Sequence, residues 1–298
     1  MFEETWTDIS PAREAGIKQH LPAIRLEIEA ALNSGSWTKK IQGANAIKTI
    51  CKDVSSGLGE QREQFVRALL AAAHGKTFDG KHHIVEALAD LCEVKEGEAG
   101  LSPALADECV AALLAEARKP EPAYKRRALA ALSRALPATT CDRFQQVYDI
   151  VKQILSKDES SVGKESDEED NEGARQRREQ LTALKEAAYD LLGKAWPQDP
   201  HTQEKYQGVF FEHCATCYAG SSRAAQLAVL AALRAVLPAL ACLGAARAPI
   251  RPRDTRDAPA DAVAAIVGHV TAIVEYTLSK AVCPPTTVIP TVCQIVIV

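Results

Sequence analysis

The sequence lacks the features of several large protein classes. Aromatic residues make up only 5% of its 298 residues, there is one Met, and alternating strand patterns are nearly absent. It also lacks a strong charge imbalance, since 35 Lys and Arg are balanced by 39 Asp and Glu for a net charge of −4. Proteins that bind nucleic acid by neutralising phosphates concentrate Lys and Arg on one face. We therefore expect no nucleic-acid partner.

The sequence also shows no signal typical of a secretory leader or of a membrane-spanning helix. The first residues, MFEETWTDIS, are acidic where a signal peptide requires a basic start and an apolar run. The apolar stretches 224–246 and 258–278 are interrupted by Arg234 and Pro238 and by Asp261, His269 and Glu275. A charge at the centre of a membrane helix costs about 2.5–3.5 kcal/mol on insertion scales. We expect no membrane insertion, and a location in the cytoplasm and nucleus.

No catalytic pattern is present. The nine cysteines are an odd number, spread singly through apolar patterns, which is typical of small buried side chains in a reducing compartment. His213, Cys214 and Cys217 have the two-residue gap of a zinc knuckle, but no second ligand pair lies at a finger-like distance. His82 and His83 have no adjacent ligands with metal spacing, and no phosphate loop or nucleophile elbow occurs. The sequence predicts no catalytic residue, no cofactor and no metal. The alternative from another class is an enzyme that uses His213, Cys214 and Cys217 with zinc.

Apolar residues instead recur every three or four positions, the spacing of amphipathic helices. Ser10-Pro11 and Ser102-Pro103 are typical helix starts, and Gly57, Gly75, Gly97 and Gly193 stand where helices are expected to end. The pattern predicts helices at 11–33, 37–56, 60–74, 79–95, 102–118, 121–136, 141–157, 174–195, 200–219, 221–243 and 259–280.

The predicted helices repeat in pairs. Alternate helices begin at Trp37, Asp79, Glu121, Arg178 and Ser221, at intervals of 42, 42, 57 and 43 residues, and the long interval contains the acidic insertion 158–173. A period of about 40–47 residues with two helices is typical of HEAT and armadillo repeats. We expect an all-α, HEAT/armadillo-like α-α superhelical solenoid, in which excess alanine allows helices to approach closely.

Four segments resemble a known family. They are Gly35–Gln42 (GSWTKKIQ), Ala73–Lys81 (AHGKTFDGK) continuing to Glu86, Tyr124–Leu132 (YKRRALAAL) and Ala195–Pro197 (AWP). In this order and at these distances, the segments resemble the C-terminal region of the Ecm-twenty-nine family, and the resemblance covers residues 1–243.

This resemblance implies a small C-terminal part of a large, non-enzymatic HEAT-repeat protein. It implies binding to the 26S proteasome, tethering of its core and regulatory particles, and links to other partners in protein quality control, including ER-associated degradation. The alternative is another HEAT-repeat scaffold, such as a nuclear transport receptor or a phosphatase scaffold.

The sequence divides accordingly into six parts. Helix pairs occupy 1–157 and 174–243, with the acidic insertion 158–173 expected to be disordered. A Pro/Arg linker follows at 244–258, then a terminal helix at 259–280 and an atypical tail at 281–298. We expect the tail, which is outside the resemblance and rich in β-branched residues, not to pack on the solenoid.

Basic residues recur in the first turns of alternate helices, where the helix dipole disfavours cations by about 0.3–1 kcal/mol. They are Lys39, Lys40, Lys81, Lys125, Arg126, Arg127, Arg177, Arg178 and Arg223. Stacked repeats would bring them into one line. Two interpretations stay open. The residues form a solvated row or a ladder of contacts between repeats, or they form a basic edge that binds acidic segments of partners.

Two further features have both a structural and a functional interpretation. Trp37, Phe78, Gly80 and Trp196 lie at helix ends, where they would cover the seam between repeats or contact a partner. Within the acidic insertion, Ser166 is followed by three acids and is a candidate phosphorylation site. The insertion is otherwise expected to be a solvated loop.

Overall fold

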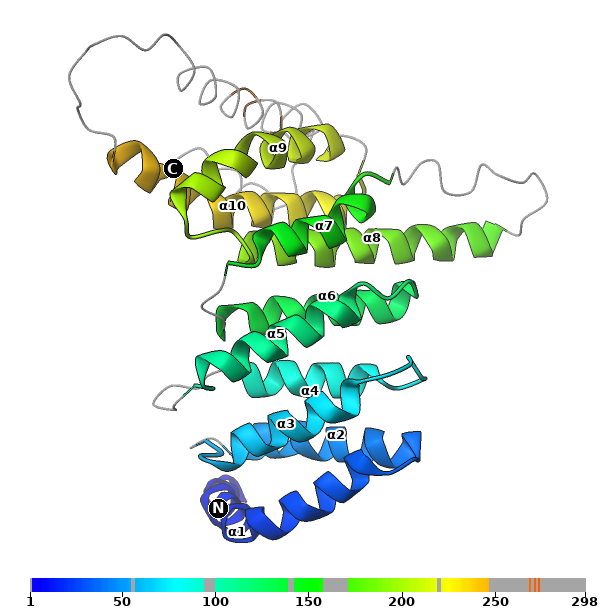
Figure 1. Cartoon of the computed structure of the whole chain (residues 1–298), viewed down its shortest axis with the longest axis vertical. Coiled ribbons are helices and arrows are strands. Elements are labelled where there is room, and N and C mark those ends of the chain that lie inside the picture. The colour runs from blue at the N-terminus through cyan, green and yellow to red at the C-terminus, as the bar shows by residue number, and fades with distance from the viewer. Residues whose placement is uncertain are drawn as a thin grey trace. The chain divides into compact units, whose positions relative to one another are not determined.

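The computed structural model describes residues 2–54, 57–93, 100–138, 142–157, 171–218 and 221–246, together with residues 268, 271 and 273. Within these ranges the regular elements are helices, and no strand occurs (Figure 1). They are α1 (Phe2–Asn33), α2 (Trp37–Asp53), α3 (Gln61–Ala73), α4 (His82–Cys92), α5 (Pro103–Ala117), α6 (Pro122–Ala135), the short 3-10 helix η1 (Leu136–Ala138), α7 (Phe144–Leu155), α8 (Asn171–Lys194), α9 (Pro200–Tyr218) and α10 (Arg223–Ala246). The predicted all-α class is confirmed.

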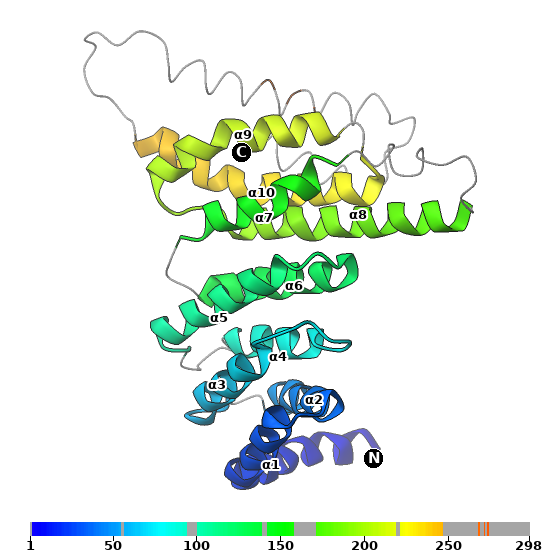
Figure 2. The same ribbon diagram turned by 45° about the vertical axis from the view of Figure 1, so that its right-hand side comes forward.

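The chain divides into two compact units, Met1–Cys141 and Asp142–Val298, here called the N-terminal and the C-terminal unit. In the N-terminal unit the helices form two layers. The even helices α2, α4 and α6 pack in sequence against one another, and the odd helices α1, α3 and α5 do the same (Figure 2). Consecutive helices also pack across the layers, as expected of stacked helix pairs.

The C-terminal unit contains α7 to α10. Helices α8 and α10 lie side by side, with α7 packed against α8 and α9 against α10 (Figure 1). Gly193 of α8 allows this close approach, because a Cβ there would lie 3.2 Å from the Cα of Ala232 in α10. Its predicted role as a helix end is wrong by one residue, since α8 continues to Lys194.

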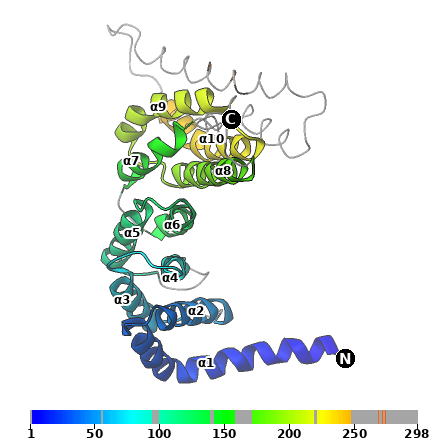
Figure 3. The same ribbon diagram turned by 90° about the vertical axis from the view of Figure 1, so that its right-hand side faces the viewer.

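Helix boundaries follow the sequence signals with one clear exception. Ser102 is the N-cap of α5 and Pro103 its first residue, as predicted, and Gly57 and Gly75 have positive φ after α2 and α3. Helix α1, however, begins at Phe2 and passes through Pro11, so the predicted start at Ser10-Pro11 is wrong (Figure 3). A proline inside a helix removes one backbone donor and crowds the preceding turn, at a cost of about 3 kcal/mol, but a helix can continue past it.

Several predictions lie partly or wholly outside the described residues. These include Gly97, residues 158–170 of the acidic insertion with Ser166, most of the linker 244–258, and the tail 281–298. Within 259–280 the described residues are Gly268, Thr271 and Ile273, and all three are helical. In the described part of the chain, no helix combines the length and apolar character needed to span a membrane.

Alanine contributes directly to the helix contacts. Ala106, Ala128 and Ala131 are almost fully buried in α5 and α6, as are Ala87 and Ala89 in α4. Such small side chains bring neighbouring helix backbones together while favouring the helical conformation. The alanine excess in the sequence is therefore part of the packing between repeats.

Candidate functional site: the basic residues of the repeats

Lys81, one of the predicted edge residues, is fully buried. Its Nζ lies 3.0 Å from Oε1 of Glu116 in α5 and 3.2 Å from the carbonyl oxygen of Gly75. The hydroxyl of Tyr124 in α6 donates to the other oxygen of Glu116. Burial and the Glu116 carboxylate together raise the pKa of Tyr124. The prediction that Lys81 lies on an exposed edge is wrong, because a buried cation requires such a partner.

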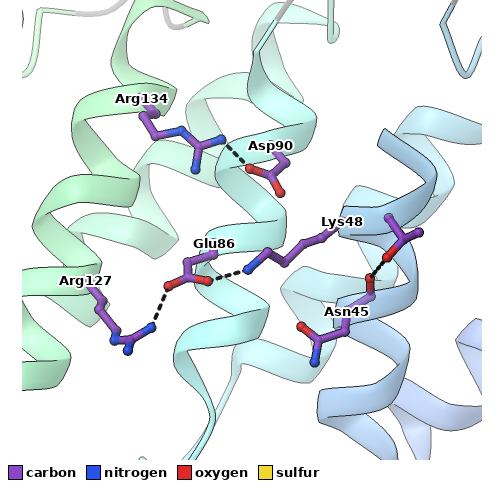
Figure 4. Close-up of polar contacts among 7 residues, drawn as sticks. Asn45, Lys48, Glu86, Asp90, Arg127 and Arg134 are labelled. Atoms are coloured by element: carbon purple, nitrogen blue, oxygen red, sulfur yellow. Dashed lines mark hydrogen bonds and ion pairs between the residues drawn. The ribbon is translucent and has the colours of Figure 1, made fainter. Parts of the chain in front are cut away.

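A second set of charges connects the even helices. Glu86 of α4 accepts from Lys48 of α2, with 2.5 Å between Nζ and Oε2, and from Arg127 of α6, with 3.1 Å between Nη1 and Oε1 (Figure 4). Burial alone would raise the pKa of Glu86, but the hydrogen bond and charge of Lys48 and the hydrogen bond from Arg127 outweigh it and lower the pKa. One carboxylate therefore joins three successive even helices.

Arg134 makes a similar connection at the other end of α6. Its Nη2 pairs with Asp90 (Figure 4). Its Nε lies 2.6 Å from Oε1 of Glu93. We call these contacts of Glu86 and Arg134 with their partners the polar seam. Exposed ion pairs each contribute about 0–1 kcal/mol, and partly buried networks are at the upper end. The polar seam supports the structural interpretation of Arg127.

Two more basic side chains donate hydrogen bonds to backbone carbonyl groups at the ends of helices. Lys40 donates through Nζ to the carbonyl oxygen of Leu32 at the end of α1, at 2.7 Å. Arg62 of α3 is buried and donates through Nε to the carbonyl of Leu91 at the end of α4, also at 2.7 Å, and through Nη2 to that of Glu93. Cations are favourable at helix C-termini, where carbonyl groups lack helical partners. Lys40 therefore has a structural contact besides any role in binding.

The nine predicted basic residues thus separate by exposure. Lys81 is buried and Lys40 and Lys125 are half-buried, whereas Lys39, Arg126, Arg127, Arg177, Arg178 and Arg223 are exposed. In the C-terminal unit, an open groove between α8 and the start of α10 is lined by Arg175, Arg178, Glu179, Thr182, Ala183, Glu186, Ser222 and Ala224. Two acids accompany its two arginines, and Arg175 pairs with Glu179 at 2.9 Å. The groove itself is not strongly basic.

The aromatic helix-end residues differ between the units. Trp196 is buried among rings, with its centroid 5.2 Å from those of Phe144 and Phe210. Trp37 is 61% exposed and stacks on Phe78 with centroids 5.4 Å apart. Trp196 therefore has the packing role, whereas Trp37 leaves most of its surface open.

The cysteine and histidine residues of α9 do not form a metal cluster. Sγ of Cys217 lies 3.6 Å from Nε2 of His213, and Cys214 is fully buried. Burial raises the pKa of both thiols and lowers that of His213, which favours neutral forms. Among the described residues, no group of three His, Cys, Asp or Glu side chains could hold a metal ion. Ser166 is not in the described ranges, so its phosphorylation stays a prediction.

The sequence pattern did not indicate the roles of the acidic partners Glu86, Asp90, Glu93 and Glu116 or the burial of Arg62. A usable signal was present in the spacing of opposite charges. Glu86 and Arg127 are 41 residues apart, and so are Glu93 and Arg134. A search for opposite charges one repeat apart would have found these two of the four ion pairs of the polar seam.

Comparison with known proteins identifies the repeats. Residues 94–271 match the family described as ECM29, C-terminal ARM-like repeats. The chain is 37% identical over 244 residues to the Drosophila melanogaster "Proteasome-associated protein ECM29 homolog", and this match covers 78% of the chain and 12% of that protein. It is 33% identical over 215 residues to the Homo sapiens "Proteasome adapter and scaffold protein ECM29", a match that covers 70% of the chain and 11% of that protein.

The chain therefore spans about an eighth or less of the length of these curated relatives. No solved structure matches it. The family match covers more than half of the chain and confirms the predicted armadillo-like repeats and the resemblance to the Ecm-twenty-nine family. This chain belongs to the ECM29 family and corresponds to its C-terminal ARM-like repeats.

Proposed function

We propose that this chain is part of a non-enzymatic scaffold that binds the 26S proteasome. The observation that carries the proposal is its membership of a family whose relatives are named as proteasome-associated and as a proteasome adapter and scaffold. Stacked helix pairs support it physically, because they present long surfaces suited to binding other proteins.

The finer parts of this role are also proposals. The scaffold would tether core and regulatory particles, link them to other proteins, and act in the cytoplasm and nucleus. Its non-catalytic character is supported by the adapter and scaffold names of the family.

Within each unit, the exposed basic residues are the proposed contacts for acidic partner segments. They are Lys39 and Arg126 in the N-terminal unit, and Arg177, Arg178 and Arg223 in the C-terminal unit. Arg127 contributes mainly to the polar seam, since it pairs with Glu86. Exposed charges of this kind change association rates and salt dependence more than stability.

The test is co-sedimentation of the purified chain with purified 26S proteasome at low salt. We expect the chain to sediment with the proteasome, and the triple variant Arg126→Glu, Arg177→Glu, Arg178→Glu to bind at least about tenfold more weakly. The matched control is the triple variant Lys52→Glu, Arg118→Glu, Lys157→Glu, at exposed residues outside the predicted set. Circular dichroism verifies that each variant is folded.

The outcomes separate the two levels of the proposal. A chain that does not sediment with the proteasome contradicts a proteasome-binding role for these repeats. Unchanged binding by the folded triple variant contradicts the basic contacts and leaves the scaffold role in place.

A further inference from the structure

An aromatic pair lies on the surface of the N-terminal unit. Trp37 is the first residue of α2, and Phe78 belongs to the segment that joins α3 to α4. Their rings are nearly parallel, with an interplanar angle of 12° and centroids 5.4 Å apart. Of the residues whose exposure the structure describes, Leu26, Trp37 and Val209 are the exposed large hydrophobic ones, and Trp37 is the most exposed at 61%.

The other tryptophan at a helix end is far less exposed. Trp196 also lies at a helix end, and its ring is buried with only 6% exposed. A single exposed aliphatic residue needs no explanation, but a tryptophan carries a large apolar surface and is enriched at the centres of protein interfaces. Phe78 stacks on one face of the Trp37 ring, and the opposite face is accessible to a partner.

The segment carrying Phe78 is fixed on both sides. Gly80 has a φ of +86°, and a Cβ at this position would lie 2.3 Å from Cδ1 of Ile41 in α2. Nζ of Lys81 donates to the carbonyl of Gly75 and so closes the segment, while Glu116 of α5 fixes Lys81. A surface that is rigid before binding loses less conformational entropy when a partner binds. The buried Lys81 thus positions the aromatic pair.

The charged residues next to the pair in the sequence are mostly basic. Lys39 and Lys40 follow Trp37 in the first turn of α2, which contains no acidic residue, and Lys76 precedes Phe78 by two positions. Lys39 and Lys76 are exposed, and the acid in the same two segments is Asp79. Two exposed lysines and the half-buried Lys40 against one aspartate favour an acidic ligand and disfavour a basic one.

We propose that Trp37 and Phe78 form a docking surface for an extended acidic segment of a partner protein, which places an aromatic ring on the exposed face of Trp37. Lys39 and Lys76 pair with carboxylates on either side of that ring. The proposal rests on the binding role of the chain proposed above, but its test does not depend on the proteasome.

The test uses short fluorescein-labelled peptides and the full chain, with binding followed by fluorescence polarisation. The first peptide is Glu-Asp-Glu-Phe-Glu-Asp-Glu, the second has Ala in place of Phe, and the third has Lys in place of each acid. We expect the acidic Phe peptide to bind, and both other peptides to bind at least about tenfold more weakly, since a central aromatic anchor typically dominates such contacts.

Variants of the chain separate the surface from the fold. Trp37→Ala and the pair Lys39→Glu, Lys76→Glu are expected to weaken binding of the acidic Phe peptide at least about tenfold, and Trp37→Phe to retain it. Val209→Ala removes an exposed apolar side chain in the C-terminal unit and is expected to change nothing. Thermal unfolding verifies that each variant is folded, and the lysine pair keeps the test valid if Trp37→Ala does not fold.

Equal binding of the Phe and Ala peptides contradicts the docking surface. Unchanged binding by the folded Trp37→Ala variant, or by the folded lysine variant, also contradicts it. Such a result together with intact sedimentation with the proteasome overturns this inference alone. Specific peptide binding without sedimentation overturns the proteasome proposal alone.

Discussion

The two units join their helices by different means. In the N-terminal unit, ion pairs connect successive even helices, with Glu86 between Lys48 and Arg127 and with Arg134 on Asp90 and Glu93. In the C-terminal unit, rings of Phe144, Tyr148, Trp196, Tyr206 and Phe210 contact one another within 6.2 Å between centroids. An average composition with few aromatics therefore conceals a local concentration of them.

This difference has physical consequences. Charge pairs at partly exposed positions weaken when salt screens them or when acid protonates the carboxylates. Packed rings depend on buried apolar area, which neither change removes. Both units have aliphatic cores, so they differ in the ion pairs or rings that join their helices in addition to those cores. We therefore expect the two units to respond differently to added salt or to acid.

The largest effect is expected at Phe144, whose ring is fully buried and contacts Trp196 and Tyr206. Phe144→Ala should lower the unfolding free energy of the C-terminal unit by about 3–5 kcal/mol, because it leaves a cavity among the rings. Urea unfolding followed by fluorescence of Trp196, with Trp6 and Trp37 replaced by Phe, measures the loss. Phe144→Leu is the milder control, and a loss below about 1 kcal/mol would show that the ring cluster is dispensable.

Lys81→Met should cost nearly as much in the N-terminal unit. The substitution leaves Glu116 buried without its cation, and breaking a buried pair from one side costs about 3–5 kcal/mol. Urea unfolding followed by circular dichroism measures the change, with Lys39→Met as an exposed control expected within about 0.5 kcal/mol of the parent chain. Similar losses in the two variants would contradict the structural role of Lys81.

Gly80→Ala is expected to cost about 1–2 kcal/mol, because the position has positive φ and the new Cβ meets Ile41. Gly75 has a φ of +95° with open space around it, so Gly75→Ala measures the backbone strain alone. Adding Ile41→Val removes the atom nearest the new Cβ and should recover part of the loss. Thermal unfolding of the single and double variants measures these changes in stability. If the effects of Gly80→Ala and Ile41→Val simply add, the result contradicts a close approach between this segment and α2.

The smallest effect is expected at Glu86. Glu86→Gln should lower stability by about 1 kcal/mol at neutral pH. Because the pKa of Glu86 is lowered in the folded state, its contribution is present above the ordinary carboxyl pKa of about 4.3 and is lost as the pH falls through the lowered pKa. The stability difference between the parent chain and Glu86→Gln should therefore shrink in acid, as urea midpoints at several pH values would show. Glu27→Gln on the exposed side of α1 is the control, and a difference that persists or grows in acid would contradict the ion pairs.

The sequence predicts the helices well because their signal is local. Apolar spacing and the Ser102-Pro103 start are contained in one element, and the structure reproduces both. Lys81 shows the limit of this reasoning, since its repeat position matches that of Lys39 but its partner Glu116 is 35 residues away. Burial of one basic residue and exposure of another at equivalent positions depends on such distant contacts.

The two tryptophans make the same point for the candidate site. Trp37 and Trp196 both stand at helix ends, and the sequence left the same two roles open for each, packing between repeats or contact with a partner. Trp196 is buried because Phe144 and Phe210 come from α7 and α9, whereas Trp37 stacks on Phe78 from the segment before α4 and stays exposed. Exposure of an aromatic side chain is a property of the assembled repeats.

Hydrogen exchange at peptide resolution, at low salt and in 1 M NaCl, tests the contrast between the units most directly, because both are compared in one sample. At about 1 M salt the Debye length falls to about 3 Å. The polar seam predicts faster exchange in α2, α4 and α6, by about fivefold for each kcal/mol lost, and little change in α7 and α9. Equal acceleration in both units, or acceleration confined to the C-terminal unit, would contradict the account.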